Sequence, residues 1–240
     1  MSGSGSLPRV LLLDLDDTII ADTASGVEPC WRAACAEPAV KRGLDAEALY
    51  QAIRTTADWY WGDPARHRQG RADLRVASAS IVEKALRSLD VADPALARRI
   101  SDDYRDRRDA GLCLFPDSIA AIEALRARGI RLGMITNGAT ADQRGKIERF
   151  KLASYFDHIQ IEGEFGLGKP EPEVYWHALA ALCAAPDETW MAGDNLEWDV
   201  AAPQRLGIGG VWVDVARGGL PAGSDVRPDR IIRTLSELLA

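Results

Sequence analysis

The chain has 240 residues, a formal net charge of −7, 47% hydrophobic residues and 27% charged residues, which is ordinary for a soluble globular protein of one large domain or two modest ones. The negative charge argues against a general nucleic-acid-binding protein, and no apolar run approaches the roughly 20 residues of a membrane-spanning helix. The loose tail over residues 1–7 lacks the features of a secretory signal, so we expect a cytoplasmic protein that binds neither nucleic acid nor membrane.

The first predicted element is a short strand from Val10 to Leu13, which ends in three carboxylates at Asp14, Asp16 and Asp17. An unbroken apolar run of this length is typical of a strand buried on both faces of a parallel sheet. Ligands of open parallel sheets bind beyond the carboxyl ends of the strands, and carboxylates this close together need a cation, a shared proton or water. Taken alone, the stretch fits a solvated turn equally well, because Asp is common in turns.

Residues 22–111 show helical periodicity and no convincing strand. Asp45 is suited to cap a helix that runs to about Trp61, and Ile81 and Leu86 belong to one apolar helix face. The sequence therefore predicts an all-helical insert in this stretch.

The sequence contains four cysteines: Cys30, Cys35, Cys113 and Cys183. None forms a C-x-x-C pair, so a zinc site is not expected. The spacing leaves a Cys30–Cys35 disulfide open, but free thiols in a reducing cytosol are the simpler interpretation.

From residue 112 onward, predicted strands and helices alternate. Strands are expected at residues 130–136, 158–161, 189–192, 210–213 and 231–232. Thr140 to Gln143 and Thr234 to Glu237 match the capping box that begins a helix, and Pro170 or Pro172 suits a first helical turn.

This alternation predicts an α/β fold, in which a Rossmann-like parallel sheet carries helices on both faces. The predicted core domain comprises residues 8–21 and 112–240, and residues 22–111 form a helical cap domain inserted between its first two strands.

Polar residues follow several of the predicted strands. Thr136-Asn137-Gly138 ends the strand at residues 130–136, Lys169 precedes a helix, and Asp194 and Asp199 follow the strand at residues 189–192. Each has an ordinary alternative as a turn residue, a surface lysine or a helix start. Together with the acids after the first strand, they are hard to explain as turns and indicate a functional site.

This set of motifs resembles the haloacid dehalogenase (HAD) superfamily of phosphohydrolases. Asp14-Leu15-Asp16-Asp17-Thr18 is similar to its first motif, D-x-D-x-T. Thr136 is similar to the second motif, Lys169 to the third, and Gly193-Asp194 with Asp199 to the fourth. The helical insert is similar in place and size to the helical cap of that family.

The resemblance implies a magnesium-dependent reaction through an aspartyl-phosphate. Asp14 would be the nucleophile, and Asp16 would protonate the leaving group and then activate water as a base. Mg²⁺ would be held by Asp14, Asp194 and the backbone carbonyl of Asp16. Asp199 would orient Lys169 or metal-bound water without contacting the metal itself.

The predicted phosphate site supplies positive charge and hydrogen-bond donors. Two like charges 4 Å apart cost about 1 kcal/mol in water and about 4 kcal/mol at an effective dielectric near 20, so a carboxylate attacks a phosphate ester only with cations nearby. Lys169 would be one such cation. The Thr136 hydroxyl and the N–H groups of Asn137 and Gly138 would bind the phosphoryl oxygens. Asp17 is assigned a turn role.

The expected cap has an unusual aromatic and basic stretch, and candidate specificity residues are Trp59, Trp61, Arg66, His67 and Arg68. Consecutive aromatics cannot share one helix face, so at least one points away from its own core. The stretch would contact the leaving group of a substrate with a second anionic group. Packing of the aromatics, with solvated arginines, is the alternative and the simpler interpretation.

The expected function is Mg²⁺-dependent hydrolysis of a small phosphate monoester of the sugar phosphate, phosphoglycolate or acylneuraminate-9-phosphate type. A phosphomutase is the nearest alternative, because it uses the same chemistry of Asp14 and Asp16. The resemblance disfavours a haloacid dehalogenase, which needs no metal and lacks the second acid, whereas Asp16 and Asp194 are present. A non-catalytic binding protein would be expected to carry damaged motifs. The choice between monomer and homodimer stays open.

Overall fold

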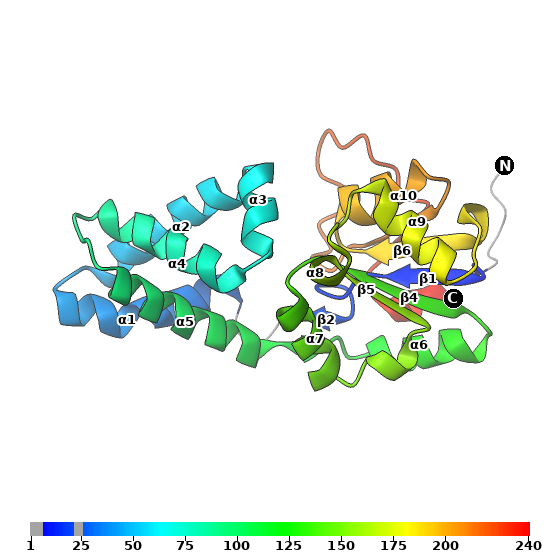
Figure 1. Cartoon of the computed structure of the whole chain (residues 1–240), viewed down its shortest axis with the longest axis horizontal. Coiled ribbons are helices and arrows are strands. Elements are labelled where there is room, and N and C mark those ends of the chain that lie inside the picture. Colours follow the sequence, from blue (N-terminus) through cyan, green and yellow to red (C-terminus); the bar gives the residue numbers. More distant parts are fainter. Residues whose placement is uncertain (1–6, 22–25) are drawn as a thin grey trace. The chain divides into compact units, whose positions relative to one another are not determined.

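The computed structural model describes residues 7–21 and 26–240. The chain divides into two compact units, Met1–Ala21 with Leu114–Ala240, here called the core unit, and Asp22–Cys113, here called the helical unit (Figure 1). The second boundary falls two residues beyond the one expected from the sequence. Residues 1–6 of the expected N-terminal tail lie outside the described residues.

The core unit is built on a six-stranded sheet in which every neighbouring pair is parallel, with the order β5-β4-β1-β6-β7-β8. Its strands are β1 (Val10–Leu13), β4 (Arg131–Thr136), β5 (His158–Ile161), β6 (Thr189–Gly193), β7 (Gly209–Val213) and β8 (Arg230–Ile232). All six strands predicted from the sequence are present, within one residue at each end. Because β1 lies between β4 and β6, the acids that follow β1 meet the residues that follow both neighbours.

The first strand is buried on both faces, as its uniform apolar sequence predicts. Val10 and Leu12 pack with Tyr175 and Leu179 from α9 (Pro172–Ala181). Successive strand side chains alternate between faces, so Leu11 and Leu13 point to the opposite face. Figure 1 shows α6 (Ser118–Ala127) on one side of the sheet and α9 and α10 (Ala202–Gln204) on the other.

Shorter elements complete the core unit. They are α7 (Thr140–Arg149), α8 (Glu162–Phe165), the 3₁₀ turns η1 (Ala153–Tyr155), η2 (Pro186–Glu188) and η4 (Leu235–Leu239), and the π-helical η3 (Leu196–Ala201). A separate two-stranded sheet pairs β2 (Ile20–Ala21) with β3 (Cys113–Leu114). Two residues are too few to produce a recognisable alternation, and the sequence did not predict these strands.

Both predicted capping boxes are wrong. Ala139, not Thr140, is the N-cap of α7, and its methyl side chain has no atom that could accept a capping hydrogen bond. Gln143, the other residue of the expected box, donates to Thr136 instead. Thr234 does precede η4, but its hydroxyl lies 2.8 Å from the Ser236 hydroxyl, and no described side chain caps that turn. In both cases a competing partner takes a polar group that the local pattern assigns to the cap.

The described part of the helical unit contains α1 (Val27–Arg42), α2 (Ala46–Trp61), α3 (Pro64–Arg71), α4 (Leu74–Arg87) and α5 (Pro94–Gly111). The helical prediction for this stretch is confirmed over residues 26–111. Asp45 caps α2 as expected, and its carboxylate accepts hydrogen bonds from the N–H groups of Glu47 and Ala48 at 2.7 and 2.9 Å.

The helical unit has its own apolar core. It includes Leu49, Ile53 and Leu86. The rings of Trp31 and Tyr104, both members of this core, stack with their centroids 3.5 Å apart. The helical unit therefore contains an apolar cluster built from its own residues.

The four cysteines, all of them within the described residues, are free thiols, so no Cys30–Cys35 disulfide forms. None of the helices within the described ranges is both long enough and apolar enough to cross a lipid bilayer.

Candidate active site

A cavity of about 200 Å³ opens at the carboxyl ends of β1, β4 and β6. It is lined by Asp14, Asp16, Asp17, Thr136, Asn137, Lys169, Asp194, Asn195 and Trp198. Of the site residues that the sequence predicted in the core unit, Gly138 and Asp199 are not part of this lining. Residues from four separate stretches of the chain therefore converge where a parallel sheet places its ligand.

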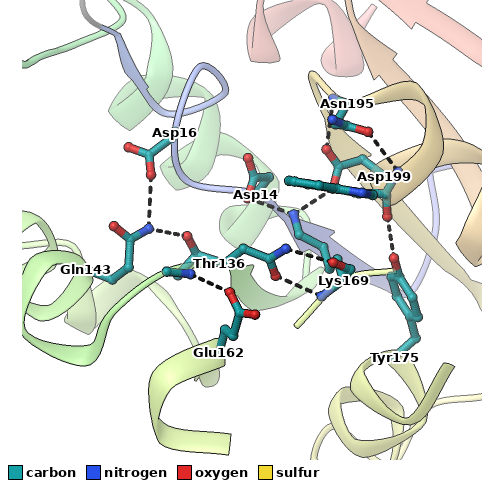
Figure 2. A network of polar contacts seen from close by, with 12 residues as sticks. Asp14, Asp16, Thr136, Gln143, Glu162, Lys169, Tyr175, Asn195 and Asp199 are labelled. Carbon is teal, nitrogen blue, oxygen red and sulfur yellow. Dashed lines mark hydrogen bonds and ion pairs between the residues drawn. The ribbon is translucent and has the colours of Figure 1, made fainter. Parts of the chain in front are cut away.

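Lys169 is the centre of a buried charge cluster. Its Nζ lies 2.7 Å from Asp14 Oδ1 and 2.6 Å from Asp199 Oδ1, and its side chain is 1% exposed (Figure 2). The other oxygen of Asp199 accepts a hydrogen bond from the Asn195 N–H at 3.0 Å. Both oxygens of Asp199 are thus engaged in holding the lysine and the start of η3.

The ionisable groups of this cluster shift one another's pKa values. Burial alone lowers the pKa of Lys169, but the adjacent Asp14 and Asp199 carboxylates outweigh it and hold that pKa above its ordinary value. Burial raises the pKa of Asp14 well above its usual range, and the nearby Asp199 and Asp194 carboxylates raise it further against the attraction of Lys169. A single ammonium therefore leaves the carboxylates only partly compensated.

Three of these carboxylates form a group that could hold a metal ion. Asp14, Asp194 and Asp199 each offer an oxygen, and these oxygens lie within 4.8 Å of one another. Burial, together with Asp199 and Asp17, raises the pKa of Asp194 to about 7, against the opposing effect of Lys169. Oxygen donors and an excess of negative charge fit a hard divalent cation such as Mg²⁺.

Asp16 faces α7. Lys146 Nζ lies 2.8 Å from each Asp16 carboxylate oxygen, and Gln143 Nε2 donates to Asp16 Oδ2 at 3.0 Å. The same Gln143 amide donates to Thr136 Oγ1 (Figure 2). The sequence pattern identifies neither α7 residue as part of the site, because Gln143 fits a capping box and an isolated lysine carries no motif.

Asn137 and Gly138 have protein partners in this structure. Asn137 Nδ2 donates to the Lys169 carbonyl, and the Lys169 N–H donates to Asn137 Oδ1, both at 2.8 Å. The Gly138 N–H donates to Glu162 Oε2 at 2.9 Å. Asn137 thus links the end of β4 to the loop that carries Lys169. The Gly138 N–H, which was expected to bind phosphate, donates to Glu162 in this structure. Sequence analysis missed Glu162, whose signal was an acid directly after β5.

Asp17 adopts the left-handed backbone conformation, with φ of 55°. Its N–H donates to the Ile20 carbonyl at 2.7 Å, which closes a turn after β1. Asp tolerates this conformation better than most residues, so the backbone agrees with the turn assigned to it.

In the aromatic stretch of the helical unit, one tryptophan is packed against the core and another is exposed. Trp61 is packed against the apolar core, and its ring meets the His67 ring edge-on at 5.4 Å. Trp59 is 48% exposed, and the Arg66 guanidinium lies over its ring, 3.9 Å from the centroid. Arg68 is exposed. Packing in the apolar core therefore accounts for Trp61, whereas Trp59 lies against two cations, since Lys84 Nζ is also 4.6 Å from its ring centroid.

Comparison with known proteins agrees with this arrangement. A family model described as haloacid dehalogenase-like hydrolase matches residues 8–207. Among similar proteins, a phosphoserine phosphatase of Thermus thermophilus is 32% identical, and the match covers 96% of this chain and 97% of that protein.

Two solved structures share the fold over nearly their whole length. A HAD phosphatase from Thermococcus onnurineus has a TM-score of 0.65 at 25% identity, covering 96% of this chain and 95% of that one. A 2-haloacid dehalogenase from Pseudomonas syringae has a TM-score of 0.63 at 26% identity, covering 97% and 98%. The match to the family model spans most of the sequence and includes the residues of the cavity, so this chain belongs to the haloacid dehalogenase-like hydrolase family.

Proposed function

We propose that this protein, a hydrolase of phosphoric monoesters, uses Mg²⁺ and an aspartyl-phosphate on Asp14 to dephosphorylate a small metabolite. The observation that carries the proposal is the contact of the buried Lys169 ammonium with Asp14, beside two further carboxylates. A buried carboxylate next to a fixed ammonium is suited to attack an anionic ester, because the ammonium offsets the repulsion between the two anions.

In the first step, an Asp14 carboxylate oxygen attacks phosphorus and the bond from phosphorus to the ester oxygen breaks. Asp16 gives a proton to the departing alkoxide. Lys169 and the Thr136 hydroxyl stabilise the phosphoryl oxygens as their charge shifts. The products of this step are a free alcohol and a phosphorylated Asp14.

In the second step, Asp16 takes a proton from a water molecule that attacks the phosphorus of the aspartyl-phosphate. The acyl phosphate bond breaks, inorganic phosphate leaves and the Asp14 carboxylate is restored. Asp16 ends the cycle protonated, ready for another leaving group.

The metal-binding residues in this proposal are the side chains of Asp14 and Asp194 and the backbone carbonyl of Asp16. When bound, Mg²⁺ supplies positive charge that neutralises the phosphoryl group and the crowded carboxylates. Asp199 is better suited to hold Lys169, since both of its oxygens already accept hydrogen bonds.

We assign substrate selection to the helical unit, acting as a cap. The exposed Trp59 with Arg66 over its ring is the strongest candidate there, because it combines an apolar face with a guanidinium. Phosphoserine is added to the candidate substrates, since a full-length relative is a phosphoserine phosphatase. Sugar phosphates, phosphoglycolate and acylneuraminate 9-phosphate remain candidates on the resemblance.

The fold alone does not separate a phosphatase from a dehalogenase, because both kinds of enzyme share it. The side chains favour the phosphatase, since Asp16 and Asp194 line the cavity together with Lys169. A dehalogenase has no use for a second acid or a metal ligand in this place.

The test is a panel of phosphate monoesters incubated with the purified full chain and MgCl₂. We expect release of inorganic phosphate from at least one small monoester. Chloride release from 2-chloropropionate without metal would instead identify a dehalogenase, and isomerisation of a phosphosugar without phosphate release would identify a phosphomutase. Inactivity toward the whole panel would favour a binding protein and contradict the proposal.

A further inference from the structure

We propose that Gln143 and Lys146, on one face of α7, are positioning residues that hold Asp16 and Thr136 in place for the two chemical steps. The inference rests on the proposed function, because it assigns roles relative to the acid–base residue and the phosphate-binding hydroxyl of that reaction. It adds residues outside the four sequence motifs to the machinery of the site.

Lys146 fixes the plane of the Asp16 carboxylate. Its Nζ is equidistant from the two carboxylate oxygens, at 2.8 Å, and its side chain is only 14% exposed. Asp16 follows β1 in a loop, and its side chain is 39% exposed. A contact to both oxygens restricts rotation of the carboxyl group and holds it in one orientation. When Asp16 carries the proton of the first step, the protonated oxygen donates to the leaving group and accepts from Lys146 only through its remaining lone pair.

Gln143 connects the acid–base residue to the phosphate-binding hydroxyl. The side chain is 2% exposed, and its amide nitrogen donates to both Asp16 Oδ2 and Thr136 Oγ1. Only the NH₂ end of the amide can donate to a carboxylate, so the orientation of Gln143 is determined. Because Thr136 Oγ1 accepts from Gln143, its own proton is left for another acceptor, which we take to be a phosphoryl oxygen.

The two residues act as a pair because of helix geometry. Residues three apart lie on the same face of a helix, so one face of α7 meets side chains from the ends of β1 and β4. A merely structural role would require only that the buried polar groups be satisfied. A positioning role also predicts that loss of the contact affects kcat/KM more for a poor leaving group than for a good one.

The decisive variant is Lys146→Met, with Arg149→Met as the matched control. Arg149 is an exposed cation in the last turn of the same helix. The readout is kcat/KM for an alkyl phosphate and for p-nitrophenyl phosphate, because this parameter reports the steps up to loss of the leaving group. A poor leaving group depends on the acid, whereas p-nitrophenolate hardly does.

We expect Lys146→Met to lower kcat/KM by roughly 10- to 100-fold for the alkyl phosphate and by less than roughly threefold for p-nitrophenyl phosphate. Acid-quenched reactions with ³²P-labelled substrate should also show more phosphorylated enzyme at steady state than in wild type, because the base step slows. Lys146→Arg, which keeps the cation, should recover much of the loss, and Arg149→Met should match wild type.

The variant Gln143→Leu tests the contact between Gln143 and Thr136 separately from the contact between Lys146 and Asp16. Inorganic phosphate in the presence of Mg²⁺ is the probe, and its inhibition constant should rise by roughly fivefold as Thr136 loses its oriented proton. In Lys146→Met the same constant should stay near wild type. Melting temperatures identify any variant that fails to fold, and Lys146→Gln then replaces Lys146→Met in the comparison.

Each outcome decides the inference. Equal losses for both leaving groups in Lys146→Met, or no loss in an active enzyme, overturn the positioning role alone. A wild-type chain inert toward the whole panel of phosphate monoesters overturns the proposed function, and this inference falls with it.

Discussion

Lys169 Nζ lies 2.7 Å from Asp14 Oδ1, although 155 residues separate the two positions in the sequence. The contact joins the end of β1 to the loop before α9 and includes Asp199 as a second acceptor on the same ammonium. Removing a buried ammonium from between two carboxylates leaves buried negative charge uncompensated, and the same ammonium offsets charge during attack on a phosphate ester.

Replacing Asp14 by asparagine should abolish turnover. Asn keeps the shape of the side chain but removes the nucleophilic oxygen, so we expect phosphate release to fall by at least roughly 10³-fold. The melting temperature should change little, because burial already disfavours the Asp14 charge. Phosphate-release assays and thermal unfolding check both parts, and retained turnover in a folded variant would refute the nucleophile assignment.

Removing the ammonium should cost stability as well as activity. Lys169→Met leaves the buried Asp14 and Asp199 carboxylates without their common partner, and we expect the free energy of unfolding to fall by about 3–5 kcal/mol. Denaturant unfolding at neutral pH measures this loss. Lys151→Met removes an exposed lysine of the same unit and should change stability little. Equal stability of both variants would show that the cluster does not need Lys169.

Gly193, the last residue of β6, is predicted to tolerate no side chain. A Cβ there would overlap the Asp199 carboxylate, which holds Lys169. Gly193→Ala should therefore lower both phosphate release and the free energy of unfolding, the latter by about 1–3 kcal/mol.

The control for that variant is Gly145→Ala in α7. An added Cβ at Gly145 meets nothing within 4 Å, so the same chemical change should leave activity intact and stabilise the helix slightly. If Gly193→Ala behaved like Gly145→Ala, the tight packing of β6 against Asp199 would have no functional consequence.

Removal of the metal should abolish phosphatase activity reversibly. The oxygens of Asp14, Asp194 and Asp199 lie within 4.8 Å of one another, with one ammonium to balance them. We expect EDTA to abolish phosphate release and excess Mg²⁺ to restore it, with Ca²⁺ as the comparison ion because it favours longer bonds and more ligands. Full activity in chelator would contradict the metal assignment.

Stability without metal should fall as pH rises from about 4 to about 7. Burial and neighbouring carboxylates raise the pKa of Asp194 to about 7 from an ordinary value of 3.8. In that window the unfolded chain has already lost the proton that the folded chain retains, so rising pH favours unfolding.

Mg²⁺ should reverse this trend, because it binds the ionised carboxylates. The increase in melting temperature on adding Mg²⁺ should therefore be larger at pH 8 than at pH 5.5. Thermal unfolding at fixed ionic strength, with NaCl as the control salt, tests this. A stabilisation by Mg²⁺ that is equal at both pH values would argue against Asp194 as a ligand.

Much of this protein was predictable from sequence because the signals were local. The apolar runs that became β1 and β4, the Asp45 cap of α2, and the order of Asp14, Thr136, Lys169 and Asp194 could all be read without a structure. Burial of a strand and capping of a helix depend on residues within a few positions of one another, so a short window contains the cause.

Tertiary structure alone decided which side chains from outside the motifs contact the residues of the cavity. Gln143 matched a capping pattern, yet its amide reaches Thr136 and Asp16, and Lys146 gave no signal until α7 lay against the end of β1. Glu162 binds the Gly138 amide for the same reason. Polar side chains that are buried or partly buried are hydrogen-bonded, and the partners of these residues lie at the ends of β1 and β4 or in the loops after them, which a local helix-capping pattern does not identify.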